Sequence, residues 1–374
     1  MLYILFTYLA APVLYFLILL RRRKQIKNIL VIQTAKIGDL ISSTPVFREI
    51  KNGYPEAHLT VMATTVTREL LENNPHVEKV ITINHADCKG LAGKLRLATL
   101  IRKGKYDIAV CLNPSVLFAL ATLWGLVPSR ISVMPNFLGT TFKCASVFFS
   151  SRERHVSGRL VIETYMRMLR AIGIESNNIT KEVYKSETAE GRVRRLLGGV
   201  SKPLIGIAVS SGNKLKELGP EKIIGLAAIL LDSTDVSIVL IGSSQDRNSS
   251  SLILKALGKR ERILDATGEL SLGELPALIE RLSLFVGVDT GIVYMADALS
   301  VPVIDIAGPS DMEDQRPTGA KSVILQEKIQ CVPCSHAFHA PYACMRNTRE
   351  CIQLMSVREI CYAIKEFFPE VHCP

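Results

Sequence analysis

One stretch of the chain shows the pattern that decides its fold: Ile29-Leu-Val-Ile-Gln-Thr-Ala-Lys-Ile-Gly-Asp-Leu-Ile-Ser-Ser-Thr-Pro45. It begins with an apolar run typical of a buried parallel strand and continues from residue 40 as a helix. The loop between them carries Lys36, Gly38 and Asp39, and the glycine permits a tight turn or the close approach of a ligand. Ligands of open parallel sheets bind at the carboxyl ends of strands, so this is a candidate binding loop. Asp is also common where helices start, so a capping role for Asp39 is the alternative.

Strands and helices alternate on both sides of a polar segment. The first half predicts strands at 29–33, 59–63, 79–83 and 107–112, and helices at 40–52, 66–72, 90–103, 117–123 and 159–171. The second half predicts strands at 204–209, 237–241, 284–286 and 303–306, and helices at 221–231, 247–257, 272–281 and 293–299. Two such series predict an α/β protein with two Rossmann-like, doubly wound domains that face a cleft.

The chain length of 374 residues suits two domains. We expect an amino-terminal anchor with its basic stop at 1–24 and a first Rossmann-like domain at 28–180. A polar, charged linker is expected at 181–202, and the second Rossmann-like domain at 203–355. The last segment, 356–374, predicts an amphipathic helix and a tail.

The first twenty residues contain no charged side chain, and a basic cluster follows them: Arg21, Arg22, Arg23 and Lys24. About 20 apolar residues are enough to cross a bilayer as a helix. A cleaved signal peptide would place its positive charge before the apolar run, and an interfacial helix would need a more polar face. We therefore expect a single-pass transmembrane helix in the inner membrane, with the basic cluster and the rest of the chain in the cytosol.

The net charge of +10 favours an anionic partner, such as phospholipid head groups, a nucleotide or a phosphorylated acceptor. Six basic residues and no acidic residue lie between Asp87 and Asp107, together with an apolar stripe at helical spacing. This stretch is either a solvated helix face or a surface for anionic lipid or a phosphorylated sugar acceptor. Nucleic acid is not expected as a partner, because the chain has one Trp and no aromatic–basic platform.

Small polar loops follow the predicted strands of the second half. The basic loop at 210–216 can hold a diphosphate, although a solvated turn has the same composition. Thr290 and Gly291 would present backbone N–H groups at a helix N-terminus, which attracts phosphate. The charge of Asp289 would repel phosphate, so we expect this residue to fix the loop or cap the helix. Together, the loops predict that the second half holds a nucleotide.

Taken in order, these motifs resemble those of the heptosyltransferase family, glycosyltransferase family 9, of lipopolysaccharide core assembly. The likeness spans nearly everything from Asn28 to the tail and rests on six segments: Lys36-Ile-Gly-Asp-Leu40 with Thr44-Pro45, Lys216-Glu-Leu-Gly-Pro-Glu-Lys222, Ala266-Thr-Gly-Glu-Leu-Ser-Leu272, Asp289-Thr-Gly291, the stretch from Ala296 to Pro302, and Gly308-Pro309. The resemblance implies a GT-B fold and an inverting, metal-independent transfer with no cofactor. The sugar, heptose from ADP-heptose, would pass from a nucleotide-diphosphate donor to a lipopolysaccharide core or other lipid-linked acceptor.

The resemblance also implies roles for single residues. Asp39 is the implied general base, an interpretation that outweighs capping, and Lys216 would stabilise charge on the departing diphosphate. Lys36 and Gly38 are expected on the acceptor side, and the donor side is expected to comprise Ser211, Asn213, Lys214, Gly242, Asp246, Asp289, Thr290, Gly291 and Tyr294. For Asp246, a charge at a helix N-terminus is an equally good interpretation. Two positions depart from the family pattern: Tyr294 replaces a common His, and Leu218-Gly219 replaces a common Trp-Pro.

One cysteine set has a spacing compatible with tetrahedral, structural zinc: Cys331, Cys334, Cys344 and Cys351. Reduced packing thiols and disulfides are the alternatives, and a cytosolic location favours thiols. Two other function classes fit the fold. A sugar-nucleotide epimerase or hydrolase gives no reason for an anchor, and a non-catalytic nucleotide-sugar-binding membrane protein gives no reason for Asp39 and Lys216.

Overall fold

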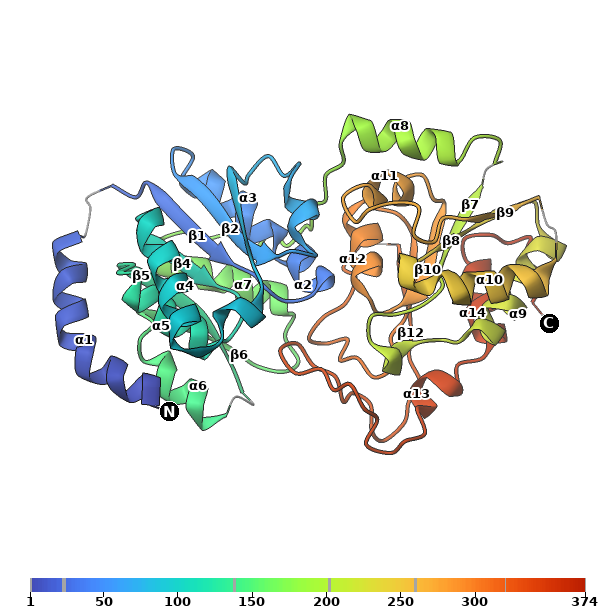
Figure 1. The fold of residues 1–374 in the computed structure, drawn as a ribbon. Coiled ribbons are helices and arrows are strands. Elements are labelled where there is room, and N and C mark those ends of the chain that lie inside the picture. Colours follow the sequence, from blue (N-terminus) through green and yellow to red (C-terminus); the bar gives the residue numbers. More distant parts are fainter. Residues whose placement is uncertain are drawn as a thin grey trace. The chain divides into compact units, whose positions relative to one another are not determined.

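The computed structural model describes residues 2–21, 25–136, 139–200, 203–258, 261–319 and 321–373. The chain divides into two compact units, Met1–Lys181 and Glu182–Pro374, called unit 1 and unit 2 below. Each unit contains a six-stranded, parallel sheet with helices packed around it (Figure 1). Arg22, Arg23 and Lys24 of the predicted basic cluster lie outside the described residues.

Unit 1 is built on a sheet with the strand order β3-β2-β1-β4-β5-β6. Its strands are β1 (Asn28–Ile32), β2 (His58–Thr64), β3 (Lys79–Ile83), β4 (Ile108–Cys111), β5 (Ser129–Pro135) and β6 (Ser151–His155). The helices after the first are α2 (Ile37–Ser42), α3 (Thr44–Gly53), α4 (Gly90–Gly104), α5 (Val116–Trp124), α6 (Thr140–Ser146) and α7 (Val161–Met168). The central strand β1 is apolar throughout its buried part because helices cover both faces of the sheet.

Unit 2 repeats this plan with the strand order β12-β11-β10-β7-β8-β9. Its strands are β7 (Leu204–Ala208), β8 (Ser237–Ile241), β9 (Ile263–Asp265), β10 (Leu284–Val288), β11 (Val303–Ile306) and β12 (Ser322–Leu325). Its helices are α8 (Glu187–Leu196), α9 (Pro220–Ser233), α10 (Arg247–Leu257), α11 (Leu275–Ile279), α12 (Gly291–Ala298), α13 (Glu350–Gln353) and α14 (Val357–Lys365). All the strands that the sequence predicts are confirmed in both units, with small shifts at their ends.

Four strands were not predicted: β5, β6, β9 and β12. In β5 the apolar pattern is interrupted by Arg130, which is nevertheless only 2% exposed. Its guanidinium donates to the carbonyl oxygens of Phe148, Val127 and Pro128, at 2.8, 2.5 and 3.0 Å. These bonds satisfy a buried charge that a sequence pattern assigns to the surface.

Two helix predictions need correction. Residues 66–72 form only a short 3-10 helix, η1 (Arg68–Leu71). The predicted helix at 40–52 is divided at Ser43, because a new helix begins at Thr44 with Pro45 in its first turn. The predicted linker at 181–202 contains α8, which packs on α11 and belongs to unit 2. The hydroxyl of Ser186 caps α8, and Arg192 forms an ion pair with Glu274 at 3.0 Å.

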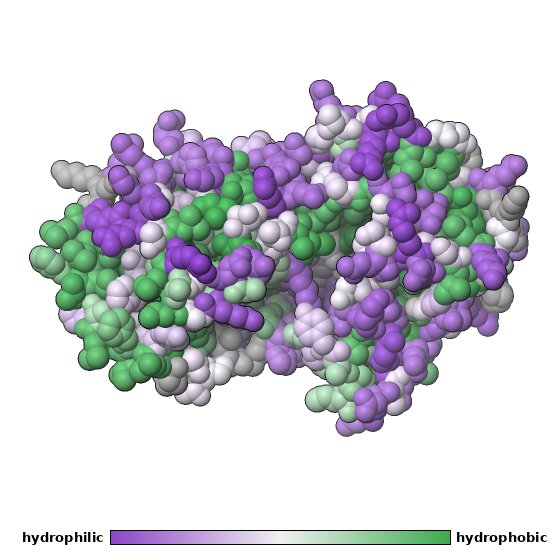
Figure 2. Space-filling view, viewed as in Figure 1, coloured by the Kyte–Doolittle hydropathy of each residue, from purple (hydrophilic) through white to green (hydrophobic). Residues whose placement is uncertain are grey.

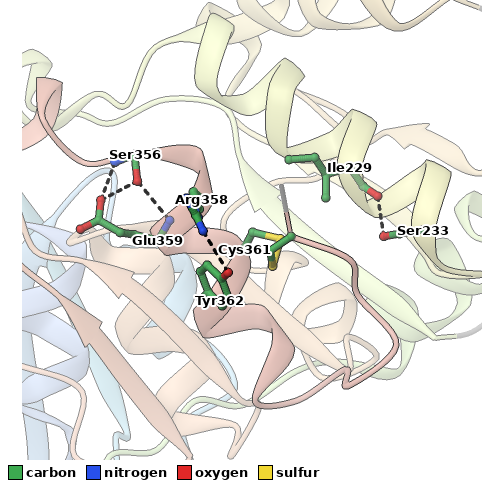
Figure 3. The surroundings of a disulfide bond; sticks show 8 residues. Ile229, Ser233, Ser356, Arg358, Glu359, Cys361 and Tyr362 are labelled. Carbon is green, nitrogen blue, oxygen red and sulfur yellow. Dashed lines mark hydrogen bonds between the residues drawn. A yellow bond between two sulfur atoms is a disulfide. The ribbon is translucent and has the colours of Figure 1, made fainter.

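The carboxyl-terminal segment packs on unit 2 through α14, whose buried Ile360 and Ile364 join the core next to α9. The Ser356 hydroxyl caps this helix, and the Glu359 carboxylate accepts a hydrogen bond from the Ser356 N–H. Figure 3 shows this cap beside the disulfide between Cys361 and Cys373, which ties the tail to the helix. The other cysteines have free thiols.

The first helix, α1 (Leu2–Arg21), confirms a 20-residue apolar helix at the amino terminus. Its most apolar window has a mean hydropathy of 2.2, so length and composition allow it to cross a membrane. Core helices and signal sequences can meet the same criterion, so the packing of α1 must be considered separately.

Candidate active site

Both sheets have a switch point, where chain connections on the two sides of one strand lead in opposite directions. In unit 1 this strand is β1, between β2 and β4, and in unit 2 it is β7, between β8 and β10. Such a point leaves a crevice at the carboxyl ends of the strands, where ligands bind. The predicted site residues lie in the loops at these two positions, and each set is described within its own unit.

In unit 2, an ion pair joins the loops that follow β7 and β10. The Lys216 ammonium donates to Asp289 Oδ2 at 2.5 Å and to the Asp289 carbonyl oxygen at 3.2 Å. The two side chains are 13% and 9% exposed. The structure therefore brings together two residues that are 73 positions apart, and Lys216 neutralises the carboxylate that would otherwise repel phosphate.

Two hydroxyl groups complete the surroundings of the Asp289 carboxylate. Ser310 donates to Oδ2 at 2.5 Å, and Tyr294 donates to Oδ1 at 2.8 Å. The tyrosine that departs from the family pattern is therefore part of the hydrogen-bonded network. Asp289 is held from three elements of unit 2, as expected of a residue that fixes its loop.

A second carboxyl group, Asp305 in β11, lies behind this network and was not predicted. It is fully buried, and neither of its oxygens has a hydrogen-bond partner among the described residues. Burial raises the pKa of Asp305, and the charge of Asp289 raises it further, while Lys216 acts in the opposite direction. An acidic residue inside an apolar strand, Val-Ile-Asp-Ile, is the signal that could have identified it.

Next to Asp289, the N-terminus of α12 offers groups suited to an anion. Thr290 is the N-cap residue of this eight-residue helix, and Gly291 is its first residue. The first N–H groups of a helix have no partner within it, and they carry partial positive charge. The Thr290 hydroxyl is buried and has no hydrogen-bond partner among the described residues. Buried polar groups normally have a partner, which makes this hydroxyl a candidate ligand contact.

The loop after β7 is structured rather than a solvated turn. The Ser211 hydroxyl accepts from the Asn213 N–H at 3.2 Å, and Asn213 Oδ1 accepts from the Leu215 N–H at 3.2 Å. Ser211 and Asn213 are each 5% exposed. Lys214 instead points outward, with a 74% exposed side chain paired to Glu217. The predicted basic loop therefore directs only one of its two lysines, Lys216, to Asp289.

The loop after β8 contains Gly242 and Asp246. The Asp246 carboxylate accepts from the N–H and hydroxyl of Ser243, at 2.8 and 2.6 Å. Burial acts to raise the pKa of Asp246, but hydrogen bonds from Ser210 and Ser243 outweigh it and the pKa is lowered. Asp246 therefore caps its own turn, as one of the two interpretations expected, and a contact to the nucleoside stays a prediction. A Cβ at Gly242 would lie 2.6 Å from Val209 and 3.1 Å from the Asp246 Cβ, so the close packing requires glycine.

In unit 1, Asp39 lies in the first turn of α2. Its Oδ2 accepts from the Lys36 N–H at 3.1 Å, which is a capping contact. Gln33, at the end of β1, donates to the Asp39 carbonyl oxygen at 3.3 Å and holds the turn. Tyr165 of α7 lies nearby: burial raises the pKa of its hydroxyl, and the Asp39 charge raises it further. Gly38 is buried, whereas Lys36 is exposed.

The cysteines of the predicted zinc set influence one another in unit 2. Burial raises the pKa of Cys351, and charge on Cys334, Cys331 and Cys344 raises it further. The pKa of Cys344 is lowered, chiefly by a hydrogen bond from the Arg349 N–H. These interactions indicate that the four thiols lie near one another, and structural zinc at this set stays a prediction.

Another group of possible metal ligands comprises Asp311, Asp314 and His336, whose ligand atoms lie within 4.8 Å of one another. His336 Nδ1 lies 2.8 Å from Asp311 Oδ2, at hydrogen-bond distance. An ordinary hydrogen bond accounts for this geometry, and we assign no ion to it.

Two parallel sheets, each with binding loops at its switch point, define an α/β protein of the GT-B-like class. A family model described as glycosyltransferase family 9 (heptosyltransferase) matches residues 76–341, well over half of the chain. The chain belongs to this family and is a glycosyltransferase.

Known relatives and solved structures agree with this assignment. Lipopolysaccharide heptosyltransferase 2 of Salmonella typhimurium is 25% identical over 80% of this chain and 88% of its own length. Lipopolysaccharide heptosyltransferase 3 of Escherichia coli is 26% identical over 75% of this chain and 83% of its own length. A family 9 glycosyltransferase from Veillonella parvula has the same fold, with a TM-score of 0.77 and 20% identity, and the match covers 93% of this chain and 99% of that one. E. coli ADP-heptose lps heptosyltransferase II also has this fold, with a TM-score of 0.72 and 21% identity, and the match covers 92% of this chain and 99% of that one.

Proposed function

We propose that this glycosyltransferase moves heptose from ADP-heptose to a lipopolysaccharide core or other lipid-linked acceptor, with inversion at the anomeric carbon and without a metal ion. The observation that carries the proposal is the Lys216–Asp289 ion pair beside the N-terminus of α12, at the switch point of the second sheet. The heptosyltransferases among the relatives support the choice of sugar and acceptor.

On the donor side, unit 2 presents hydrogen-bond donors where the leaving diphosphate would lie. The Lys216 ammonium and the first N–H groups of α12 converge near Asp289, and the Thr290 hydroxyl is a further hydrogen-bond donor. As the bond between the anomeric carbon and the diphosphate oxygen breaks, these groups would stabilise the negative charge that develops there. Ser211, Asn213, Gly242 and Asp246 would shape the rest of the donor pocket, with exposed Lys214 at its rim.

On the acceptor side, Asp39 would take the proton from the acceptor hydroxyl while its oxygen attacks the anomeric carbon from the face opposite the diphosphate. Attack from that face inverts the configuration. The capping contact to the Lys36 N–H fixes the direction of the carboxylate, which suits a base that acts largely through orientation. Lys36 and Gly38 would border the acceptor.

A lipid-linked acceptor would call for an enzyme at the cytoplasmic face of the inner membrane. The apolar helix α1 supports membrane attachment, because its length and composition suit a bilayer and it belongs to unit 1. Unit 1 carries the proposed acceptor side, so attachment through α1 would hold that side near a lipid-linked substrate.

Turnover of a panel of nucleotide sugars by wild-type protein and Asp39→Asn tests the proposal. An asparagine can still accept from the Lys36 N–H but is not a base, so this variant separates capping from catalysis. We expect transfer to fall by a factor of about 10²–10⁴, while thermal stability stays close to that of the wild type. Glu153→Gln, which alters a partly exposed ion pair with Arg167 in the same unit, is the matched control and should retain full activity.

Each alternative gives a different product pattern. Release of free sugar or an epimerised nucleotide sugar without acceptor would indicate a hydrolase or epimerase. Binding of the donor with no turnover on any acceptor would indicate a non-catalytic protein. Equal transfer by wild-type and Asp39→Asn proteins would remove Asp39 as the base.

A further inference from the structure

The helix α1 packs along unit 1 from end to end. Near its start, the Lys94 ammonium of α4 lies 4.4 Å from the centre of the Tyr3 ring. At its other end, Arg21 donates to the Gly125 carbonyl oxygen at 3.4 Å. These two contacts are 18 residues apart, or about 27 Å along a helix, which is close to the thickness of a bilayer core. A helix that crosses a membrane leaves its domain at one end, so it could not keep both contacts.

The inner face of α1 belongs to the core of unit 1. Ile4, Leu14 and Ile18 are 4%, 6% and 6% exposed, and they join a cluster of buried residues that includes Phe118 and Leu123 of α5. This face spans the length of the helix. Exposing it to lipid would break apart a continuous apolar core instead of adding to it.

The polar groups of α1 also find their partners in unit 1. Trp124 Nε1 donates to the Thr7 hydroxyl at 3.0 Å, and the Tyr8 hydroxyl donates to the Cys144 carbonyl oxygen at 2.8 Å. The guanidinium of Arg130 lies 5.5 Å from the centre of the Tyr15 ring. A spanning helix would carry these hydroxyls into hydrocarbon, where only its own backbone could satisfy them.

The outer face of α1 is a continuous apolar surface, here called the α1 face. Its residues are each at least 60% exposed and follow helical spacing: Leu2, Leu5, Phe6, Leu9, Val13, Phe16, Leu19 and Leu20. Exposed Leu91 and Leu95 lie on α4, the helix whose Lys94 contacts Tyr3. Figure 2 shows the apolar side chains gathered over α1 at the left of the molecule. Contiguous patches of this kind mark interaction sites.

We propose that α1 lies in the plane of an anionic bilayer, with the α1 face in the lipid and the opposite face still packed on unit 1. This is a monotopic attachment, and it replaces the single-pass anchor that the sequence alone predicts. It depends on the packing of α1 and on the charge of the neighbouring basic stretch, and it does not depend on the reaction that the enzyme catalyses.

The positive charge next to α1 favours an anionic bilayer, and not a second copy of the chain, as the partner of the α1 face. The stretch from Lys89 to Lys105 contains six basic residues and no acidic residue, and all of them except half-buried Lys94 are exposed. Lys94 of this stretch lies 4.4 Å from the centre of the Tyr3 ring, so two copies that met through the α1 face would bring two such stretches towards each other. Phospholipid head groups carry the opposite charge and attract basic segments at the membrane surface.

The single tryptophan of the chain makes the proposal testable in the full-length protein. Trp124 stacks on Phe6 with ring centres 5.8 Å apart and planes at 7°, so its fluorescence reports whether α1 remains docked. The protein is mixed with vesicles of phosphatidylethanolamine and phosphatidylglycerol, or of phosphatidylcholine alone. We expect co-sedimentation with the anionic vesicles, no red shift of Trp124 emission and no greater quenching by aqueous acrylamide.

Variants separate the surface from the fold. Leu9→Glu and Phe16→Glu on the α1 face should weaken vesicle binding by about tenfold to a hundredfold, with an unchanged emission spectrum in solution. Leu252→Glu, at a 58% exposed apolar position on α10 of unit 2, is the matched control and should bind like the wild type. Arg96→Gln with Lys103→Gln should reduce binding to anionic vesicles.

Three results would overturn the proposal. A red shift with increased quenching on vesicle binding would mean that α1 leaves unit 1. Protection of an amino-terminal tag from protease added outside sealed vesicles, while unit 1 is cleaved, would mean that α1 spans. Dimers that depend on Leu9 and form without vesicle binding would mean that a second copy covers the α1 face. Asp39→Asn should bind vesicles like the wild type, so failure of attachment is distinguishable from failure of catalysis.

Discussion

Replacing Asp289 with asparagine tests how strongly unit 2 depends on its central ion pair. The asparagine oxygen can still accept from a hydroxyl of Ser310 or Tyr294, but the Lys216 ammonium loses its counter-charge. Removing one partner of a buried ion pair costs about 3–5 kcal/mol. Because Lys216 keeps a 13% exposed side chain, we expect the lower end of that range, about 3 kcal/mol. For a unit of this size, that corresponds to a fall in Tm of about 6–12 °C.

Thermal and urea unfolding measure the effect, with circular dichroism following the whole chain. The fluorescence of Trp124 reports separately on unit 1 and serves as an internal reference. Glu269→Gln alters an ion pair whose side chains are 55% and 43% exposed, so it should change the free energy of unfolding by about 1 kcal/mol or less. If Asp289→Asn destabilises the protein no more than Glu269→Gln does, the reasoning is wrong.

A double-mutant cycle identifies the partner. Lys216→Met removes the ammonium, so adding Asp289→Asn to it should cost much less than Asp289→Asn alone. Additive losses in the double variant would show that Asp289 stabilises unit 2 through its hydroxyl partners and not through Lys216.

Three further outcomes follow from buried groups. Asp305 has a folded-state pKa above its ordinary value of 3.8, so its contribution to stability is present below pH 3.8 and is lost as the pH rises through the folded pKa. Asp305→Asn should therefore flatten the fall of unfolding free energy with pH, measured by urea unfolding from about pH 4 upward. An unchanged pH dependence would contradict the raised pKa. Arg130→Met leaves three carbonyl oxygens without their donor and should lower the free energy of unfolding by about 3 kcal/mol or more. The fluorescence of Trp124 measures this loss, and a loss below about 1 kcal/mol would refute the role of the three hydrogen bonds. At Gly206 in β7, a Cβ would lie 2.4 Å from Leu282, so Gly206→Ala should cost about 1–3 kcal/mol in urea unfolding, and a neutral result would show that Leu282 moves aside.

Much of the architecture could be predicted because buried parallel strands are apolar along their whole length. The central strands β1, β7 and β10 show this pattern, and the loops after them could be located in the sequence. The edge strands β6 and β12 escaped prediction. β6 reads Ser-Arg-Glu-Arg-His and has no apolar residue, and β12 has only four residues, all partly buried.

The candidate site was predictable only in part. Lys216, Asp289 and Thr290 lie in loops that directly follow strands, and a strand-to-loop pattern locates such residues. Asp305 and Ser310 complete the same site but belong to β11 and the loop after it. Their part in the network depends on which strands are neighbours, and periodicity does not state strand order.

The N-terminal helix shows most clearly what could not be predicted from the sequence. Composition by itself determined that residues 2–21 form an apolar helix, because each residue type contributes to hydropathy independently of its neighbours in space. Only the tertiary structure decided that Ile4, Thr7 and Ile18 face unit 1 while Leu9 and Phe16 face outward. The distinction depends on the apolar surface and hydrogen-bond acceptors that α5 and α6 present to α1, which are brought together only when the chain folds. In the same way, the sequence determined that Lys216 and Asp289 lie in loops after separate strands, and the parallel pairing of β7 with β10 decided that their charges meet.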